Sequence, residues 1–334
     1  MQGKAVVFTA PRKVDWQPLE LPDPGPGDVV IRVQHSWISN GTEGSFLRCE
    51  RVNGETPWTE GAPWPFPLVP GYQKTGRVEW VGKDVQGIRK GDLVFATVSR
   101  VGDSFYESFG GHVSPAVTAS HQVWLLPEGL PEQAACGLVL LQVGYNCGTR
   151  TPIEKGDVVL VIGDGLVGHW SGQTLADRGA TVILTGKHED RLVLFGPCPP
   201  HHTVDITKVD PLEKVRAWAP AGLSAVVDTV GSVQDLERFM PVMKRGGHLV
   251  SAGFHGSEGK MDLQHLRFRE LSLHSPSGWD KDRMDATLTL LAEGRLQTEH
   301  LITHRFPASN ASEAYDLILK RKEPVLGVIL DWET

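Results

Sequence analysis

The chain has 334 residues and a mass of 36.5 kDa, which predicts about two domains at roughly 150 residues per domain. Hydrophobic residues make up 40% and charged residues 22%, so the composition supports a large core and excludes global disorder. The formal net charge of -7 argues against a protein that coats nucleic acid, because phosphate binding draws on clustered positive charge. No apolar run reaches the roughly 18 residues of a membrane span, and the N-terminus has no signal-peptide core. These features indicate a soluble, cytoplasmic protein.

The first 127 residues have the pattern of an all-β, loop-rich domain. Short apolar segments separated by Gly and Pro are expected to form strands at 4–9, 29–34, 75–81, 92–97 and 122–126. Residues 48–66 contain Trp58, Trp64 and three prolines without periodicity, so we expect a long irregular loop there. Such a loop either covers a substrate cleft or packs on a neighbouring subunit.

From about residue 128 the pattern changes to alternating strands and helices. After a helix-length segment at 130–150, strands are expected at 157–163, 181–185, 204–206, 225–228, 248–253 and 272–275. Helices are expected between them at 167–179, 211–219, 233–243 and 281–293. This alternation predicts an α/β fold with a doubly wound parallel sheet. The last segment is expected to add a helix at 309–320 and a strand at 327–330.

A G-x-G-x-x-G motif lies between the buried strand at 157–163 and the helix that follows it. In that context the motif predicts a dinucleotide site. Gly163 allows the tight turn, Gly165 lets the backbone approach a pyrophosphate, and Gly168 lets the helix pack against the strand. Leu166 and Val167, at the start of the helix expected at 167–179, are also predicted to bind the cofactor, because the helix N-terminus faces the phosphate charge.

The end of the second strand distinguishes NAD(H) from NADP(H). A site for NAD(H) has Asp or Glu there, which accepts a hydrogen bond from the ribose 2′-hydroxyl. Here Gly186 is followed by Lys187, His188 and Arg191, whose side chains suit a 2′-phosphate. We therefore predict NADP(H). NAD(H) is the alternative, in which Lys187 and Arg191 are solvated residues that open a helix.

Ligands of doubly wound sheets bind beyond the carboxyl ends of the strands. Thr229 and Val230 follow one strand, and Gly253 and Phe254 follow the next, so we expect these four residues to approach the cofactor. Trp279 follows another strand end. It is expected either to flank the nicotinamide or to lie in the core or an interface.

Over nearly its full length the chain resembles the medium-chain dehydrogenase/reductase superfamily. The stretches 36–43, 68–73 and 301–332 are similar to its bacteriochlorophyllide dehydrogenase (BchC-like) branch. The resemblance implies a GroES-like β-barrel catalytic domain formed by residues 1–127 and 301–334. It also implies a Rossmann dinucleotide-binding domain at 128–300, and a homodimer.

The resemblance also identifies the positions that bind zinc in zinc-dependent members. The Cys position falls on Asn40, the His position on Tyr72, the Glu position on Gln73 and the third ligand near Val139. Zinc is bound by thiolate, imidazole or carboxylate groups, so this set predicts no catalytic zinc. The segment from about 90 to 120, which would hold a four-Cys structural zinc, contains no cysteine. We therefore expect no metal.

The remaining cysteines and histidines do not suggest a metal site either. Cys49, Cys136, Cys147 and Cys198 lack the spacing of metal ligands and are expected to be free thiols. His201 and His202 follow a Pro-rich stretch and are expected to lie in a loop.

Without zinc, hydrogen-bond donors must stabilise the alkoxide that develops during hydride transfer to a ketone. Tyr72 is the predicted proton donor, since tyrosine has an unperturbed pKa of about 10. Asn40 and Gln73 are expected to orient Tyr72 or the substrate, and Thr42 matches the proton-relay hydroxyl of zinc-dependent members. In the alternative interpretation Tyr72 is a packed wall residue.

The sequence thus predicts a zinc-independent, NADP(H)-preferring oxidoreductase that interconverts a secondary alcohol and a ketone. The substrate is expected to be a polyol, cyclitol or sugar-like molecule, or a macrocycle that carries a hydroxyethyl group. Trp58, Trp64 and Trp279 are candidate substrate contacts. A zinc-free enoyl or quinone reductase and a non-catalytic NADPH-binding protein are the alternatives.

Overall fold

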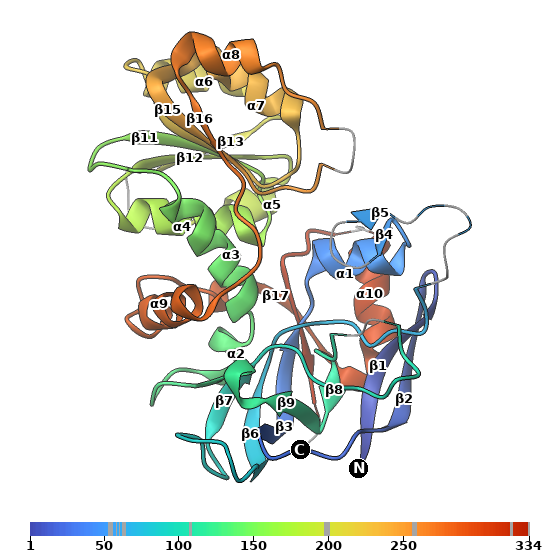
Figure 1. Ribbon diagram of the computed structural model, residues 1–334. Coiled ribbons are helices and arrows are strands. Elements are labelled where there is room, and N and C mark those ends of the chain that lie inside the picture. The colour runs from blue at the N-terminus through green and yellow to red at the C-terminus, as the bar shows by residue number, and fades with distance from the viewer. Residues whose placement is uncertain are drawn as a thin grey trace. The chain divides into compact units, whose positions relative to one another are not determined.

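The computed structural model describes residues 1–52, 56–57, 59, 61, 65–106, 109–196, 201–255, 259–320 and 323–332. The chain folds as two compact units (Figure 1). Unit 1 comprises Met1–Val139 and Thr298–Thr334, and unit 2 comprises Leu140–Gln297. None of the helices in the described ranges has the length and apolar character of a transmembrane span.

Unit 1 is built mainly of β-strands. In the described part of the chain these are β1 (Gln2–Ala10), β2 (Lys13–Glu20), β3 (Asp28–Trp37), β4 (Arg51–Val52), β5 (Thr56–Pro57), β6 (Lys74–Val81), β7 (Leu93–Ala96), β8 (Val113–Ser114), β9 (Ala116–Ala119), β10 (Val123–Leu125), β17 (Ile302–Pro307) and β18 (Gly327–Asp331). Its helices are α1 (Asn40–Leu47), η1 (Ser120–Gln122), α2 (Glu132–Ala135), η3 (Glu299–Leu301), η4 (Ala308–Asn310) and α10 (Ala311–Lys320).

The strands of unit 1 form the GroES-like part of the fold. One sheet has the order β10-β7-β6-β3-β18-β17, with β9 also paired to β3, and a second has the order β2-β1-β8. The C-terminal strand β18 runs antiparallel to β3, with Ile329 opposite Trp37. The end of the chain therefore completes the sheet that the N-terminal segment begins. The core between these sheets is apolar and includes buried residues of α10.

Unit 2 alternates strands and helices along the chain. Its described strands are β11 (Val158–Ile162), β12 (Thr181–Gly186), β13 (His201–Asp205), β14 (Leu223–Asp228), β15 (Met243–Ser251) and β16 (Ser272–His274). Its described helices are α3 (Leu138–Thr149, whose first two residues belong to unit 1), α4 (Leu166–Asp177), α5 (Glu189–Leu192), α6 (Pro211–Trp218), α7 (Val233–Phe239), η2 (Met240–Val242), α8 (Leu263–Arg269) and α9 (Lys281–Ala292).

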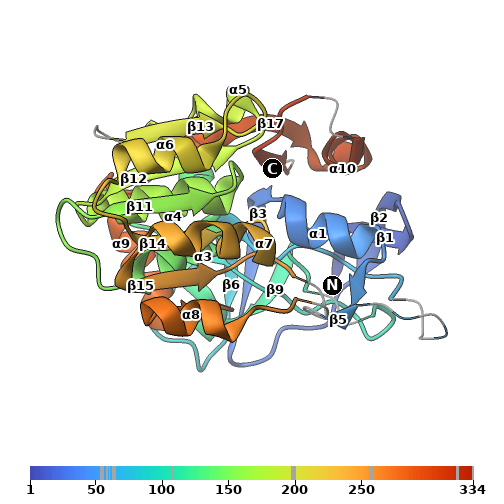
Figure 2. The ribbon, with the colours of Figure 1, turned by 90° about the horizontal axis from the view of Figure 1, so that it is seen from above.

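The strands of unit 2 form a parallel Rossmann-type sheet in the order β13-β12-β11-β14-β15-β16. Helices α6, α7 and α8 lie on one face and α4 on the other, as Figures 1 and 2 show. Separate apolar clusters fill the two faces. Ile162 lies opposite both Thr185 and Asp228, so the segments after β11, β12 and β14 leave the same edge of the sheet. The predicted α/β class is confirmed.

The structure differs from the sequence-based elements in several places, and four of these differences concern a predicted helix, two predicted loops and the predicted all-β region. The helix expected at 130–150 is interrupted at Gly137, where a Cβ atom would lie 2.9 Å from the Trp37 ring. The loop expected at His201 and His202 is wrong, because both residues lie in β13 and pair with β12. The His202 ring stacks on Trp218, with centroids 4.1 Å apart.

The other two differences fall in the N-terminal part of the chain. Helix α1 occupies Asn40–Leu47 within the region expected to be all-β. The segment expected to be an irregular loop contains the short ladder of β4 and β5. Trp58 and Trp64 lie outside the described residues.

Candidate functional site

The glycine turn of unit 2 connects β11 to α4. Gly163 has a φ of 115°, and a Cβ there would come 2.4 Å from Thr229 Oγ1. A Cβ on Gly168 would lie 1.9 Å from the Gly163 carbonyl oxygen, so both positions require glycine. Gly165 differs, because a Cβ there would meet no atom within 4 Å.

The space at Gly165 faces the start of α4. Gly165 is the N-cap residue of this helix, and no side chain accepts a hydrogen bond at the cap. Leu166 and Val167 form the first turn. An uncapped helix N-terminus behind an open glycine suits a pyrophosphate, because the backbone can approach the ligand and donate N–H groups to it.

The carboxyl ends of β14 and β15 lie at the same edge and are held by Asp228. This fully buried carboxylate accepts hydrogen bonds from the N–H groups of Val230, Gly231 and Ser232. Thr229 donates from both its N–H and its hydroxyl to the Ile162 carbonyl. Asp228 was not predicted as a site residue. The sequence pattern that identifies it is an aspartate at the end of an apolar strand, followed by a turn that contains glycine.

Two predicted cofactor contacts at this edge expose apolar side chains. Val230 is 58% and Phe254 40% exposed, and Gly253 donates its N–H to the Asp228 carbonyl. Trp279 is half-buried in the segment between β16 and α9. The roles of these residues remain predictions.

The end of β12 contains a carboxylate that the sequence analysis did not identify. Asp164 Oδ2 accepts the N–H groups of Lys187 and His188, both at 2.8 Å, and lies 2.9 Å from His188 Nδ1. Asp164 Oδ1 lies 3.3 Å from Arg191 Nη1. The three residues predicted to bind a 2′-phosphate therefore lie together, and an internal anion lies among them.

The charge of Asp164 is stabilised although the side chain is buried. Burial opposes ionisation, but hydrogen bonds from the His188 ring and from the N–H groups of His188 and Lys187 outweigh it and lower the pKa of Asp164. The only sequence signal for this arrangement is an acidic residue between the first two glycines of the motif.

In unit 1 the structure places Tyr72 against the start of α1. The Tyr72 hydroxyl donates to Ser39 Oγ at 2.7 Å, and Ser39 is the residue before Asn40. Asn40 Nδ2 donates to the Leu326 carbonyl at 2.6 Å, whereas its buried Oδ1 has no hydrogen-bond partner among the described residues. Sequence reasoning missed Ser39.

The two other predicted catalytic residues lie nearby along the chain. Gln73 is fully buried and donates from Nε2 to the Trp37 carbonyl at 3.3 Å. Thr42 is half-buried in the first turn of α1, and its carbonyl accepts the Ser45 hydroxyl. Their catalytic roles remain predictions.

A buried polar cluster fixes the start of α1. Glu43 Oε1 accepts the Ser39 N–H at 2.7 Å, and Oε2 interacts with His112 Nε2 at 2.9 Å and with the Tyr315 hydroxyl. His112 Nδ1 lies 2.8 Å from Ser36 Oγ. Burial and the neighbouring Glu43 charge raise the pKa of Tyr315, which stays a neutral donor.

The positions that correspond to zinc ligands do not fit zinc. Zinc ligands present a lone pair on thiolate, imidazole or carboxylate. Tyr72 instead donates its proton to Ser39, the Asn40 and Gln73 amides donate to carbonyls, and Val139 is a buried apolar residue. Within the described ranges, no group of three His, Cys, Asp or Glu side chains is arranged to hold a metal ion.

The cysteines of the described residues have no disulfide partner and remain thiols. Cys49, Cys136 and Cys147 are free, and Cys198 lies outside the described residues. Burial raises the pKa of the Cys147 thiol to about 12 and raises that of Cys136 further, so neither presents a thiolate at neutral pH.

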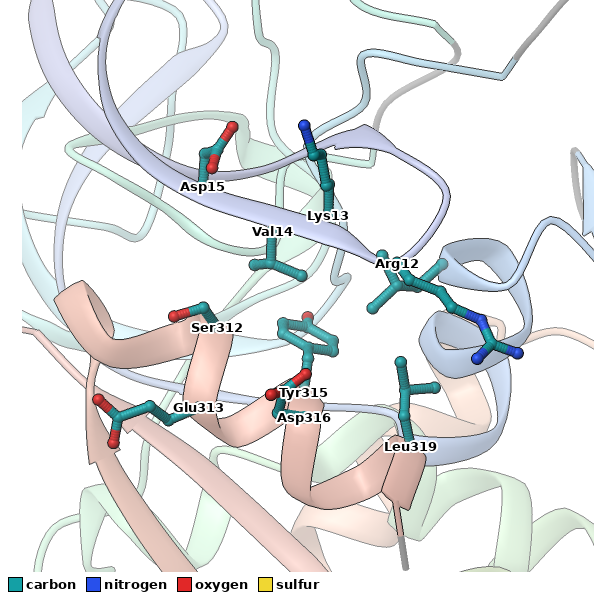
Figure 3. A pocket seen from close by; sticks show the side chains of 10 residues that line it. Arg12, Lys13, Val14, Asp15, Ser312, Glu313, Tyr315, Asp316 and Leu319 are labelled. Atoms are coloured by element: carbon teal, nitrogen blue, oxygen red, sulfur yellow. The ribbon is translucent and has the colours of Figure 1, made fainter.

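A pocket of about 290 Å³ opens in unit 1 between β2 and α10 (Figure 3). Its polar lining comes from Arg12, Lys13 and Asp15 on one side and from Ser312, Glu313, Tyr315 and Asp316 on the other. It contains none of the predicted site residues. Tyr315 lines the pocket, and its buried hydroxyl donates a hydrogen bond to Glu43 Oε2.

Comparisons with known proteins agree with this architecture. A family model described as "Zinc-binding dehydrogenase" matches residues 167–293. A 2-desacetyl-2-hydroxyethyl bacteriochlorophyllide A dehydrogenase of Cereibacter sphaeroides is 28% identical over 99% of both chains. An alcohol dehydrogenase of Cupriavidus necator is 24% identical over 98% of both chains. The solved alcohol dehydrogenase of Thermus sp. ATN1 superposes with a TM-score of 0.83 at 22% identity, covering 99% of this chain and 100% of its own.

Proposed function

Because the chain belongs to the medium-chain dehydrogenase/reductase superfamily, we propose that it interconverts a secondary alcohol and a ketone by hydride transfer, using a nicotinamide dinucleotide. The observation that carries this proposal is the turn from Gly163 to Gly168, with open space at Gly165 and an uncapped helix behind it. The dinucleotide, when bound, supplies or accepts the hydride. The backbone of the turn binds its pyrophosphate, and Thr229, Val230, Gly253 and Phe254 lie beside it.

Tyr72 is the proposed proton donor to the alkoxide. Its hydroxyl donates to Ser39 Oγ at 2.7 Å in this structure, so for transfer Tyr72 exchanges that hydrogen bond for one to the alkoxide and is left as a phenolate. The buried Oδ1 of Asn40 has no hydrogen-bond partner among the described residues, and we propose that a substrate hydroxyl donates to it. Gln73, through the Trp37 carbonyl, and Thr42, in the first turn of α1, support this arrangement.

The proposed chemistry is independent of zinc. The ligand positions of zinc-dependent relatives are filled here by groups that donate hydrogen bonds or are apolar. Hydrogen-bond donors therefore stabilise the developing alkoxide.

The proposed cofactor is NADP(H), because Lys187, His188 and Arg191 lie together at the end of β12. For the substrate we propose a secondary alcohol on a polyol, cyclitol or sugar-like molecule, or a hydroxyethyl group on a larger ring. The second class is motivated by the relative that acts on a hydroxyethyl bacteriochlorophyllide.

The first experiment is titration of the protein with NADH and NADPH, followed by energy transfer from tryptophan to the nicotinamide. Gly165→Ala should weaken binding at least about tenfold, because its methyl group occupies the path of the pyrophosphate. The melting temperature should not change, since the methyl group meets no atom of the protein. Gly27→Ala is the matched control, since a Cβ there also meets nothing within 4 Å.

Two results would contradict the binding proposal: wild-type protein that binds neither cofactor, or equal affinity in Gly165→Ala and the control. Binding without turnover of any alcohol, carbonyl or alkene would instead indicate a non-catalytic NADPH-binding protein. Turnover of activated alkenes alone would indicate an enoyl or quinone reductase.

Zinc independence is tested by metal analysis of active protein. We expect zinc well below one ion per chain and activity that survives a chelator. One tightly held zinc ion per chain would refute the mechanism. Once a substrate is found, Tyr72→Phe should lower kcat and leave NADPH binding unchanged.

The proposed assembly is a homodimer. In the described part of unit 2, β16 is the last strand of the sheet and has one unpaired edge. Unpaired edges are ready templates for pairing with another chain. Light scattering after size exclusion should give twice the mass of the 36.5 kDa chain.

A further inference from the structure

We infer that Asp164 sets the relative affinity for NADH and NADPH. Its carboxylate lies at the end of β12, where the strand itself has no acidic residue. This inference rests on the proposed function, since it requires that unit 2 binds a nicotinamide dinucleotide. It concerns a residue of the glycine turn rather than one of the second strand.

The position of Asp164 is defined by its contact with Gly186. A Cβ on Gly186, the last residue of β12, would lie 2.3 Å from Asp164 Oδ2 and 2.4 Å from Asp164 Cβ. The Asp164 side chain therefore fills the space into which a residue at 186 would project. Sites for NAD(H) have an acidic side chain at the end of this strand. Here a carboxylate occupies that place although the strand ends in glycine.

Asp164 also occupies the donors that a 2′-phosphate would use. The N–H groups of Lys187 and His188 and the His188 ring all contact Oδ2, and Arg191 contacts Oδ1. The Asp164 side chain is only 7% exposed, and its lowered pKa keeps it charged at neutral pH. A phosphate dianion bound to these donors would lie beside the Asp164 carboxylate. Repulsion between the two negative charges would weaken its binding unless it displaced the carboxylate.

The same carboxylate is able to bind a ribose. Asp164 Oδ1 has its longest contacts, 3.2 Å to His188 Nδ1 and 3.3 Å to Arg191 Nη1, so it retains capacity to accept a hydrogen bond from a ribose hydroxyl. The exposed Lys187 ammonium and the partly buried Arg191 guanidinium still carry positive charge that attracts a phosphate. These cations favour NADPH, and Asp164 counteracts them in favour of NADH.

The test compares dissociation constants for NADH and NADPH. Asp164→Asn removes the charge and keeps the shape, and Asp164→Gly removes the whole side chain. Each should lower the ratio of the NADPH to the NADH dissociation constant at least about tenfold. The double variant Asp164→Gly/Gly186→Asp returns a carboxylate to the same place from β12, since Asp164 supplies the three nearest atoms to a Cβ at 186. It should restore the wild-type ratio.

Asp157→Asn is the matched control. Asp157 lies just before β11, whereas Asp164 follows that strand, so the two carboxylates are at opposite edges of the sheet. Asp157 is also partly buried and interacts with Lys244 and Ser224. Its substitution should lower the melting temperature and leave the cofactor ratio unchanged.

The outcomes separate the inference from the proposed function. Wild-type protein that binds neither cofactor overturns both. Protein that binds cofactor, with a ratio changed less than twofold in the Asp164 variants, overturns the inference alone. If the single variants fail to fold, the double variant decides: a wild-type ratio supports the inference, and a ratio shifted toward NADPH overturns it.

Discussion

Glu43 in unit 1 and Asp164 in unit 2 are both buried carboxylates beside a histidine ring. Glu43 is 1% exposed and Asp164 6% exposed, and each lies 2.9 Å from its histidine. Their partners differ. His112, beside Glu43, is fully buried, whereas the side chain of His188, beside Asp164, is 46% exposed.

This difference indicates what each carboxylate does. The acceptor positions of Glu43 are used by interior groups, the Ser39 N–H, His112 and Tyr315. All of these groups are buried, so we expect the cluster to serve the fold. The partners of Asp164 lie at the carboxyl ends of the strands, beyond which ligands of doubly wound sheets bind, so we propose that the same pairing affects a ligand. On this proposal the exposure of the partner, rather than that of the carboxylate, distinguishes the two roles.

The largest expected effect is loss of stability on removal of Glu43. Glu43→Ala leaves three buried donors without their acceptor, which should cost about 3–5 kcal/mol of unfolding free energy. Denaturant titration, followed for each unit because two units need not unfold together, measures it.

Glu43→Gln is the control for this prediction. It keeps an acceptor for Ser39 and Tyr315 and should lose much less stability than alanine. NADH affinity should be unchanged in both variants, and a large loss of affinity would contradict the view that Glu43 only supports the fold.

Lys74 provides a pH-dependent test of the closed interior of unit 1. It is fully buried and donates to the carbonyls of Thr97 and Gly110. Burial lowers its pKa to about 7 from 10.5. Between these values the unfolded chain binds the proton and the folded chain does not, so stability should rise with pH by about 1 kcal/mol per unit.

Lys74→Met is the control variant, because methionine has no titratable group. The wild-type protein should gain stability relative to this variant from pH 7 to pH 9. Equal pH profiles would show that Lys74 keeps an ordinary pKa in the folded state.

The sequence predicts the parts of this molecule that depend on local pattern. The glycine turn, β11 and β12 follow from a buried apolar run, three glycines and a second apolar run, and the structure confirms these elements. The α/β class follows from the alternation of strands and helices in the same region.

Contacts between distant segments were not predictable in this way. Ser39 and Tyr72 are 33 residues apart, and Asp164 and His188 are 24 residues apart. His201 and His202 were misassigned to a loop because proline dominates the local pattern, whereas pairing with β12 determines the strand. The roles of Tyr72, Asn40, Thr42 and Gln73 stay predictions, since position alone does not establish chemistry.

The smallest expected effect concerns the other carboxylate, Asp164. Asp164→Asn should lose only about 1–2 kcal/mol at pH 7, because asparagine keeps the shape and one acceptor oxygen for the surrounding donors and loses only the charge. Hydrogen bonds hold the pKa of Asp164 below 3.8, so its contribution is present above that value and is lost as the pH falls through the lower folded value. The difference from wild type should therefore persist to about pH 4 and narrow only below it.

Binding of NADPH distinguishes the loss of stability in Asp164→Asn from the loss in Glu43→Ala. Saturating NADPH should raise the melting temperature of Asp164→Asn more than that of wild type, because tighter binding adds stability to the folded state. In Glu43→Ala the NADPH-induced shift of the unit 2 transition should equal that of wild type. Calorimetry with and without NADPH measures both shifts. If NADPH stabilised Asp164→Asn no more than wild type, Asp164 would belong with Glu43 as a residue that serves only the fold.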